Sequence, residues 1–241
     1  MAIWGSIIGG MLGFSIGGPF GMLLGSLIGG KMSRARSGGG FRSFAQPQQI
    51  FALSLIVLSA KLSKADGQVS REELIAVKDK LKIPENEIEQ VGKIFNKAKE
   101  ESTGYEPYAQ QIAQIYRNNL NVLEEVINIL FYIAEADGNL SKSELDMIQS
   151  IAEIFGLTQT QFNSIKESRK SSDKLNPYIV LECSPEEDLK SIRKKYLKLS
   201  KEHHPDILIS KGVPEEVIQE SKKKMRAINS AWDKIQKLKS N

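Results

Sequence analysis

The two histidines of the sequence stand side by side, and Pro205 and Asp206 follow them directly. A histidine near a carboxylate can act as a metal ligand or as a general base. Metal binding is disfavoured here, because neighbouring side chains on a helix diverge and no third ligand lies near His203 and His204 in the sequence. A hydrolase would need a nucleophile and an oxyanion site, and neither has a recognisable motif in the chain. By themselves, these residues indicate a helix end followed by a polar loop.

Two amphipathic helices are predicted around this stretch. Ser184, followed by Pro185 and two glutamates, is typical of a helix start, and Pro205 is expected to end that helix. A second long helix is expected from near Pro214. The apolar residues of each helix fall on one stripe, formed by Leu189, Ile192, Tyr196, Leu199 and His203 in the first helix and by Met225, Ile228, Trp232 and Ile235 in the second. These stripes predict an antiparallel hairpin with its exposed turn at His-Pro-Asp and with His203 packed in the core.

The opposite face of the first helix is basic. It carries Lys190, Lys194, Lys198 and Lys201, with Arg193 at its edge. Exposed charges of one sign on one helix face steer an acidic partner surface and orient it. Glu202 interrupts this basic face near the end of the helix.

The composition is that of an ordinary globular protein of 241 residues, with 41% hydrophobic and 26% charged residues. Its 33 Lys and Arg nearly balance 29 Asp and Glu, which leaves a net charge of +4. This charge is too small for a dedicated nucleic-acid-binding protein. The single cysteine, Cys183, excludes an intramolecular disulfide and a zinc site built on cysteine pairs.

The N-terminal stretch from Ile3 to Gly30 contains no charged side chain. As a helix it would be about 42 Å long, whereas the hydrocarbon core of a bilayer is about 30 Å thick. Tilt, or a kink at Pro19, would take up the difference. A cleaved signal peptide is disfavoured, since no basic residue precedes the apolar run and no small-residue cleavage site ends it. We therefore expect a single-pass transmembrane helix over residues 1–31, with a re-entrant or interfacial segment as the alternative.

Glycine recurs at every fourth position of this stretch. The glycines are Gly5, Gly9, Gly13, Gly17, Gly21, Gly25 and Gly29. Residues four apart share one helix face, so a second helix can approach closely along this ridge, which predicts self-association in the membrane. The basic residues Lys31, Arg34 and Arg36 come next and place the rest of the chain in the cytoplasm by the positive-inside bias. Residues 32–45 are expected to form a basic, flexible tether.

The middle region, residues 46–168, has helical periodicity throughout, which predicts an all-α fold. It contains a repeated motif, Lys-Ala-Asp-Gly-Gln-Val-Ser-Arg-Glu-Glu-Leu and then Glu-Ala-Asp-Gly-Asn-Leu-Ser-Lys-Ser-Glu-Leu. In each copy a helix ends at an Asp-Gly turn and the next helix begins with a capping box. The boxes pair Ser70 with Glu73 and Ser141 with Glu144.

The glycine and the last glutamate of each copy have the spacing of an EF-hand calcium loop. The first and third ligand positions would be Leu62 and Lys64 in one copy and Ile133 and Glu135 in the other, so the loops lack the oxygen ligands they need and EF-hands are excluded. Two interpretations of the acidic residues stay open. In the first, they serve as helix caps and turn formers. In the second, the two repeats face each other and the acidic residues form a metal site, which would consist of Asp66, Glu73, Asp137 and Glu144.

The repeated Asp-Gly motif within a helical region resembles the TerB-like (tellurite-resistance) family. The motif lies at Asp66 and Gly67 in the first copy and at Asp137 and Gly138 in the second, and the resemblance covers residues 46–168. It implies an all-helical domain whose acidic residues are suspected of binding metal. Residues 169–174, which are polar and free of apolar periodicity, are expected to be a linker.

Residues 175–241 resemble the J-domain of DnaJ-type proteins in three separate segments. The segments are Pro-Tyr-Ile-Val-Leu, then Ile192 to Asp206, then Lys-Met-Arg-Ala-Ile-Asn-Ser-Ala-Trp-Asp-Lys-Ile. The resemblance implies that the basic helix face docks on a DnaK-type chaperone and that the His204-Pro205-Asp206 loop stimulates that partner's ATP hydrolysis. The chain departs from the pattern at Ile207, where a lysine or arginine is usual, and at Glu182, where a glycine is usual.

The order of anchor, TerB-like region and J-domain resembles the DjlA-like family, which are membrane-anchored DnaJ co-chaperones of bacteria. It implies an all-α protein of the inner membrane with its C-terminal bulk in the cytoplasm. It also implies a protein without catalytic activity or a cofactor of its own, since ATP is bound by the partner chaperone. The partners expected are a DnaK-type chaperone, a second copy of the chain and the membrane, with no nucleic acid. The alternatives are a membrane scaffold with the J-domain as a docking module, or a metal-responsive sensor that uses the TerB-like domain.

The glycine ridge leads to a test of self-association. Between helices in lipid there is no hydrophobic driving force, so close packing of the backbones must provide the attraction. Replacing Gly13, Gly17 and Gly21 by leucine keeps the segment apolar but separates the backbones. Association measured with a membrane two-hybrid reporter should fall by at least about tenfold, the factor expected for a loss of about 1.4 kcal/mol. Unchanged association would show that the anchor is monomeric.

Overall fold

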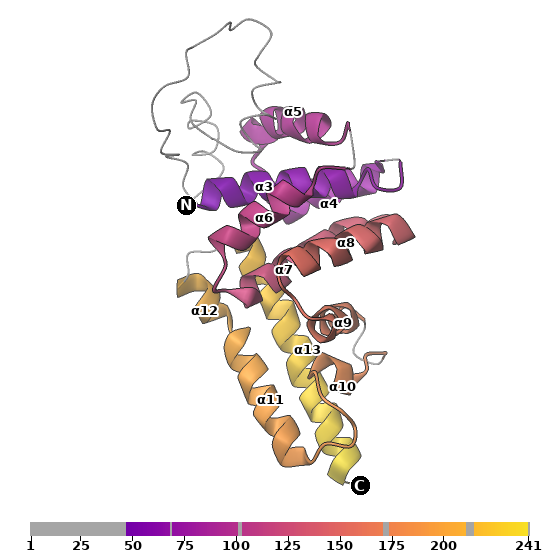
Figure 1. Ribbon diagram of the computed structural model, residues 1–241, viewed down its shortest axis with the longest axis vertical. Helices are drawn as coiled ribbons and strands as arrows, with labels where there is room; N and C mark the ends of the chain where they lie inside the picture. Colours follow the sequence, from indigo (N-terminus) through magenta and orange to yellow (C-terminus); the bar gives the residue numbers. More distant parts are fainter. Residues whose placement is uncertain (1–46, 68, 101–102, 171–173, 211–214, 241) are drawn as a thin grey trace, which may run out of the picture. The chain divides into compact units, whose positions relative to one another are not determined.

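The computed structural model describes residues 47–67, 69–100, 103–170, 174–210 and 215–240. Its elements are α3 (Pro47–Leu62), α4 (Arg71–Lys80), the 3-10 turn η1 (Glu85–Glu87), α5 (Ile88–Ala98), α6 (Glu106–Ile115), α7 (Leu120–Ala134), α8 (Lys142–Ile154), α9 (Gln159–Ser168), α10 (Pro177–Val180), α11 (Leu189–Glu202), α12 (Pro205–Ser210) and α13 (Glu215–Ser240). No strand occurs among these residues, so the prediction of an all-α fold is confirmed (Figure 1).

The expected membrane anchor, its glycine ridge and the basic tether lie outside the described residues. Within the part that the structure describes, none of the helices has both the length and the apolar character needed to cross a bilayer.

The chain forms two compact units, and two of its helices are shared between them. The first unit contains the described residues up to Ile115 together with Leu130–Ile148, and the second contains Tyr116–Ile129 together with the described residues from Gln149 onward. The beginning of α7 and the whole of α9, which belong to the TerB-like region by sequence, therefore group with the helices of the J-domain region.

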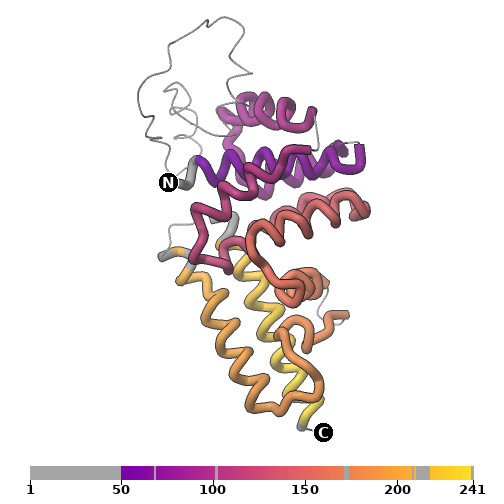
Figure 2. The backbone as a smooth tube through the Cα atoms, viewed as in Figure 1, coloured from indigo at the N-terminus to yellow at the C-terminus, as the bar shows by residue number. Residues whose placement is uncertain are grey.

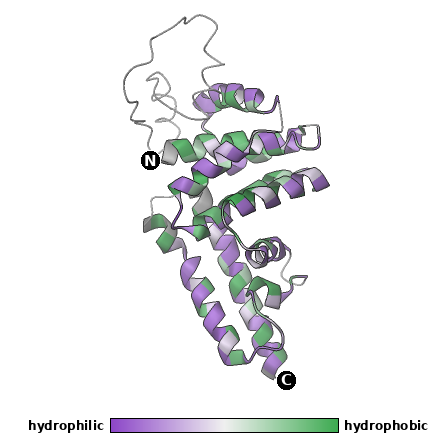
Figure 3. Ribbon diagram, in the orientation of Figure 1, coloured by the Kyte–Doolittle hydropathy of each residue, from purple (hydrophilic) through white to green (hydrophobic). Residues whose placement is uncertain are grey.

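The first unit is built around α3, which packs against α5 and α6 (Figure 2). From Phe51 to Ser63 every residue of this segment is buried, and Figure 3 shows α3 as largely hydrophobic. A helix that is apolar on all sides must be enclosed by other helices. Ala109 and Ile112 of α6, together with Ile94 of α5, provide part of this enclosure.

In the second unit, α11 and α13 form the predicted antiparallel hairpin, and α10 packs against α13 (Figure 1). The predicted stripes meet in one core, which contains Leu175, Val180, Leu181, Ile192, Leu199, Ala227, Ile228, Ala231, Trp232 and Ile235. The rings of Tyr196 and Trp232 stack across the hairpin with centroids 5.0 Å apart and an interplanar angle of 9°. Such aromatic pairs add to the stabilisation from buried area. Leu189, which was expected on the same stripe, is 37% exposed.

The boundaries of α11 differ from the prediction at both ends. Ser184 does not cap the helix; its N–H donates to Glu187 Oε1 (2.8 Å) in a turn that precedes the helix. The N-cap is Asp188, whose Oδ1 accepts from Ser191 N–H at 2.8 Å. This carboxylate accepts a hydrogen bond from an N–H group that has no partner within the helix. The helix therefore starts after Asp188 and not after the upstream serine.

At its other end, α11 finishes before the proline that was expected to stop it. The helix ends at Glu202 with His203 as C-cap, and Pro205 is instead the first residue of the short helix α12. Proline is well suited to a first helical position, because the N–H that it lacks would have no partner there. The His-Pro-Asp sequence therefore lies at a junction of two helices rather than in an open loop.

Glu182, between α10 and α11, adopts a left-handed backbone conformation with φ +53°. A side chain is disfavoured there, which explains why a glycine is usual at this position of the resembling family. Its carboxyl group is partly buried, and burial raises its pKa.

Replacing Glu182 by glycine should therefore stabilise the protein. Glycine removes the cost of the left-handed conformation but also raises the entropy of the unfolded chain, which opposes the gain. The net increase in the free energy of unfolding is about 0.5–1 kcal/mol, or about 2–4 °C in Tm. A carboxyl whose pKa is raised on folding loses its stabilising contribution as the pH rises above its unfolded pKa, so the gain should be larger at pH 8 than at pH 4. Thermal denaturation followed by circular dichroism at pH 4 and pH 8 measures the increase in Tm and its dependence on pH.

Lys82→Gly is the matched control. Lys82 is exposed and is the other described non-glycine residue with positive φ (45°), but it has no carboxyl to titrate. The increase in Tm caused by Lys82→Gly should be the same at pH 4 and pH 8. A Tm of Glu182→Gly at or below that of the wild type would contradict the argument.

Candidate functional site

The His-Pro-Asp triad is presented to solvent at the junction of α11 and α12. The side chains of His204 and Asp206 are 51% and 81% exposed. The N–H of Asp206 donates to Nδ1 of His204 at 3.3 Å, and the N–H of Ile207 donates to the carbonyl oxygen of His204 at 3.0 Å. Because Nδ1 accepts a hydrogen bond, the neutral ring carries its proton on Nε2. The backbone thus fixes the histidine ring while leaving it accessible.

The predicted basic face of α11 is also accessible. Its members Lys190, Arg193, Lys194, Lys198 and Lys201 are all exposed. One loose ion pair is formed, between Lys198 Nζ and Glu202 Oε1 at 3.9 Å, which fits the expected interruption of the face by Glu202. Lys195 is not part of the face; it points to the preceding turn and pairs with Glu187 Oε1 at 2.8 Å. The face offers positive charge that is little compensated by the described side chains.

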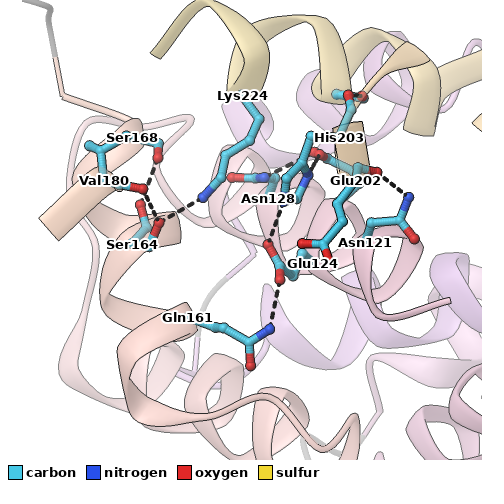
Figure 4. A network of polar contacts seen from close by, with 12 residues as sticks. Asn121, Glu124, Asn128, Gln161, Ser164, Ser168, Val180, Glu202, His203 and Lys224 are labelled. Atoms are coloured by element: carbon cyan, nitrogen blue, oxygen red, sulfur yellow. Dashed lines mark hydrogen bonds and ion pairs between the residues drawn. The ribbon is translucent and has the colours of Figure 1, made fainter. Parts of the chain in front are cut away.

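His203, the neighbour of the triad, is buried as predicted, but its surroundings are polar. Its ring is 2% exposed and lies between two carboxylates of α7 (Figure 4). Nε2 lies 3.3 Å from Oε2 of Glu124, and Nδ1 lies 3.4 Å from Oε1 of Glu125. The other oxygen of Glu124 accepts from Gln161 Nε2 of α9 at 3.0 Å. The sequence analysis expected only packing at His203 and missed these partners.

Burial determines the charge state of this cluster. It lowers the pKa of His203 to about 4 and raises the pKa of Glu124. The mutual attraction of the two groups acts in the opposite direction but is the smaller effect. Burial therefore favours the neutral forms of both His203 and Glu124. Lys224, which is 2% exposed, lies nearby and donates to Ser164 Oγ at 2.9 Å.

A cleft of about 590 Å³ opens beside the junction of α11 and α12. Its lining combines the ends of several helices and consists of Asn118, Leu120, Asn121, Glu124, Gln161, Lys198, Lys201, Glu202, His203 and Ile207. Two lysines of the basic face thus also line a cleft that the beginning of α7 helps to form.

The repeated acidic motifs of the first unit act as helix caps. The N–H of Ser70 donates to Glu73 Oε2 (2.8 Å), and Ser70 Oγ accepts from the N–H of Glu73 (3.0 Å). Ser141 and Glu144 form the same reciprocal pair at 2.9 and 3.2 Å. The prediction of two capping boxes is confirmed.

The carboxyl groups of the two boxes also meet. Glu73 and Glu144 are 4% and 3% exposed. Burial raises the pKa of Glu73 to about 7, with a further rise from the charge of Glu144. Burial also raises the pKa of Glu144, and the charge of Asp66 adds to this rise, while a hydrogen bond from Glu73 favours its charged form. The two repeats therefore face each other through a pair of buried carboxyl groups.

This meeting does not amount to a metal centre. Among the described residues, no group of three or more His, Cys, Asp or Glu side chains is arranged to hold an ion. Asp137, another candidate ligand, accepts a hydrogen bond from the N–H of Asn139 at 2.8 Å and so stabilises the turn in which it lies. The geometry supports the capping interpretation of these acidic residues.

Comparison with known proteins matches three family models to successive parts of the chain. Residues 1–38 match the co-chaperone DjlA transmembrane domain, residues 52–167 match the tellurite resistance protein TerB, and residues 176–239 match the DnaJ domain. Relatives named co-chaperone protein DjlA match nearly the whole chain: 27% identity in Photobacterium profundum (98% of this chain, 99% of the relative), 28% in Vibrio parahaemolyticus (99% and 99%) and 25% in Escherichia coli K12 (99% and 99%). The chain is similar to DjlA over nearly its whole length. No solved structure matches it significantly.

These matches support a membrane-anchored J-domain co-chaperone, as the order of the sequence motifs predicted. In this DjlA-like chain the triad and the basic face lie within the DnaJ match, whereas Glu124 and Glu125 lie within the TerB match. One signal for the missed residues was present in the sequence: two adjacent glutamates stand within a mostly apolar helix. Such a pair must be buried with polar partners.

The raised pKa of Glu73 gives a pH-dependent prediction. The pKa of Glu73 is raised on folding from 4.5 to about 7, so its contribution to stability is lost as the pH rises from about 4.5 through 7. Glu73→Gln keeps an acceptor for the N–H of Ser70 but removes the titration. In thermal unfolding, the free energy of unfolding of the variant should match that of the wild type at pH 4.5 and exceed it by about 1–2 kcal/mol at pH 8.

Glu72→Gln, an exposed neighbour on α4, is the control and should show no such trend. A parallel pH dependence of Glu73→Gln and the wild type would refute the raised pKa of Glu73.

Proposed function

We propose that the chain recruits a DnaK-type chaperone to the cytoplasmic face of the bacterial inner membrane and stimulates its ATP hydrolysis. The observation that carries this proposal is the exposed His204-Pro205-Asp206 triad at the end of an exposed basic helix face, within a DnaJ-domain match. The chain acts as a regulator and not as an enzyme. It takes no cofactor of its own, because the partner chaperone binds the ATP.

Docking and stimulation are assigned to different residues. Lys190, Arg193, Lys194, Lys198 and Lys201 attract and orient an acidic surface of the partner. Charges of this kind chiefly raise the association rate, and salt screens them over a Debye length of about 8 Å at physiological ionic strength. The triad, held by backbone hydrogen bonds at the tip of the hairpin, then acts on the bound partner. Pairing of two chains through the glycine ridge would present two such tips together.

The two departures from the J-domain pattern bear on affinity. Ile207 brings an apolar side chain next to the triad, where a positive charge is usual, so the charge contribution there is smaller. Glu182 is partly buried, and its carboxyl group interacts electrostatically with Lys198, which offsets part of the charge of the basic face. Both departures weaken attraction to an acidic partner and leave the geometry of the triad unchanged.

The test uses the full chain in detergent micelles and a purified DnaK-type chaperone. Steady-state ATP hydrolysis is measured as the chain is titrated, which gives a maximal stimulation and a half-saturating concentration. His204→Gln should abolish the stimulation while the helical circular dichroism signal stays unchanged, because His204 is exposed and stabilises little. A fully active His204→Gln variant would exclude this role of the triad. Binding of the wild type without stimulation would favour the scaffold alternative.

The basic face is tested in the same assay. Lys194→Ala with Lys198→Ala should raise the half-saturating concentration several-fold with little change in maximal stimulation, and should flatten the salt dependence of binding. Lys222→Ala with Arg226→Ala removes the same charge from an exposed face of α13 and serves as the control. Equal salt slopes for the wild type and the α11 variant would exclude the basic face as the docking surface.

A further inference from the structure

The end of α11 is held by a helix that lies within the TerB match. Asn121 Nδ2 of α7 donates to the carbonyl oxygen of Glu202 at 2.8 Å. Glu202 is the last residue of α11, and the last four carbonyl groups of a helix have no partner within it. Asn121 therefore caps α11 from a distant part of the sequence, two residues before the triad begins.

The next residue, His203, is held on both its ring and its backbone. Its ring lies beside Glu124 of α7 (Figure 4) and also contacts Glu125 of α7. Its carbonyl oxygen accepts from Ser221 Oγ of α13 at 2.5 Å. A buried imidazole that lost its polar partners would incur a cost of desolvation. The two residues that immediately precede His204 are thus both fixed by contacts from α7.

The first part of α7 is in turn anchored to the helices of the J-domain region. Arg169 Nη1 donates to the carbonyl oxygen of Asn128 at 3.0 Å, which joins the end of α9 to α7. Ser164 Oγ of α9 donates to the carbonyl oxygen of Val180 at 3.0 Å, and Lys224 of α13 donates to the same hydroxyl group. These contacts lie within one compact unit, so α7 is a fixed support for the end of α11.

The support leaves the functional surface open. The triad side chains are 51% and 81% exposed, and all five members of the basic face are exposed. A helix that inhibited docking would cover these groups. Among the described residues, α7 donates a hydrogen bond to Glu202 and places two carboxyl groups beside the ring of His203, and the triad side chains stay exposed.

We propose that Asn121, Glu124 and Glu125 of α7 are positioning residues for the His204-Pro205-Asp206 triad. The unit that stimulates the partner chaperone then comprises residues 116–129 and 149–241, and not the J-domain alone. This inference rests on the proposed function. It gives the TerB-like region a defined contribution: it sets the direction in which the triad leaves α11.

Loss of a positioning residue has a distinct kinetic signature. The basic face still brings the partner to the chain, so the half-saturating concentration should stay close to that of the wild type. The triad would occupy its productive orientation for a smaller part of the time, so the maximal stimulation should fall. Removal of a docking lysine should instead raise the half-saturating concentration and leave the maximal stimulation nearly unchanged.

Asn121→Asp is the sharpest variant. The replacement has the same shape, but a carboxylate cannot donate to the carbonyl oxygen of Glu202 and repels it. Maximal stimulation should fall about fivefold, the ratio expected from loss of one ordinary hydrogen bond. Asn118→Asp is the matched control, because Asn118 is exposed, lines the same cleft and makes no hydrogen bond to α11 within the part of the chain that the structure describes, while the change in charge is identical. It should behave as the wild type.

A structural measurement accompanies the assay. Hydrogen exchange of the segment 203–210, followed by mass spectrometry on the full chain in micelles, should become faster in Asn121→Asp and remain unchanged in Asn118→Asp. Glu124→Ala and Glu124→Gln provide a second test if Asn121→Asp unfolds. The alanine variant should show the same defect, and the glutamine variant, which retains hydrogen-bonding groups next to His203, should restore most of the stimulation.

The outcomes separate this inference from the proposed function. If the wild-type chain does not stimulate the chaperone at all, the proposed function fails, whatever the variants do. If the wild type stimulates and Asn121→Asp equals it in maximal stimulation, the positioning role is overturned, even if hydrogen exchange becomes faster. A lower maximum shared by Asn118→Asp would also overturn it, since that result would reflect the added charge alone.

Discussion

The burial of His203 between two glutamates of α7 is the constraint on which the functional end of this protein depends. A polar ring enclosed in protein requires polar partners. Within the hairpin of α11 and α13, Leu199 and Ser221 form hydrogen bonds with the backbone of this residue. The ring lies beside Glu124 and Glu125, on a helix that precedes it by about eighty residues. The place where α11 ends is therefore tied to the position of α7, and the triad begins directly after that place.

Adjacent residues at this junction have opposite roles because the backbone turns there. His203 is the C-cap of α11 and points into the core, whereas His204 and Asp206 point to solvent. The buried histidine is neutral, since burial lowers its pKa to about 4, so it contributes packing and polar contacts rather than charge. Positive charge is instead placed on the outer face of α11, where water and salt can screen it until a partner arrives.

The first unit uses buried carboxyl groups in a different way. Each repeat caps a helix with a glutamate, and burial raises the pKa of Glu73 to about 7, with a smaller rise from the charge of Glu144. Two buried carboxylates in proximity cannot both be charged without cost. Internal repetition thus produced a matching pair of caps, and the burial of these caps made Glu73 sensitive to pH near neutrality.

The sequence by itself determined the local features of this protein. Helical periodicity gave the all-α class and the hairpin, the Ser-x-x-Glu spacing gave both capping boxes, and the alternation of apolar and basic positions on α11 gave the buried stripe and the exposed face. These features depend on residues a few positions apart, whose relation is set by the helix itself. The tertiary structure alone decided the start of α11 at Asp188, the partners of His203 and the grouping of α7 and α9 with the J-domain helices. Each of these depends on which distant groups meet. The adjacent glutamates of α7 indicated that polar partners must exist, but only the packing of the chain could show that the partner is the histidine beside the triad.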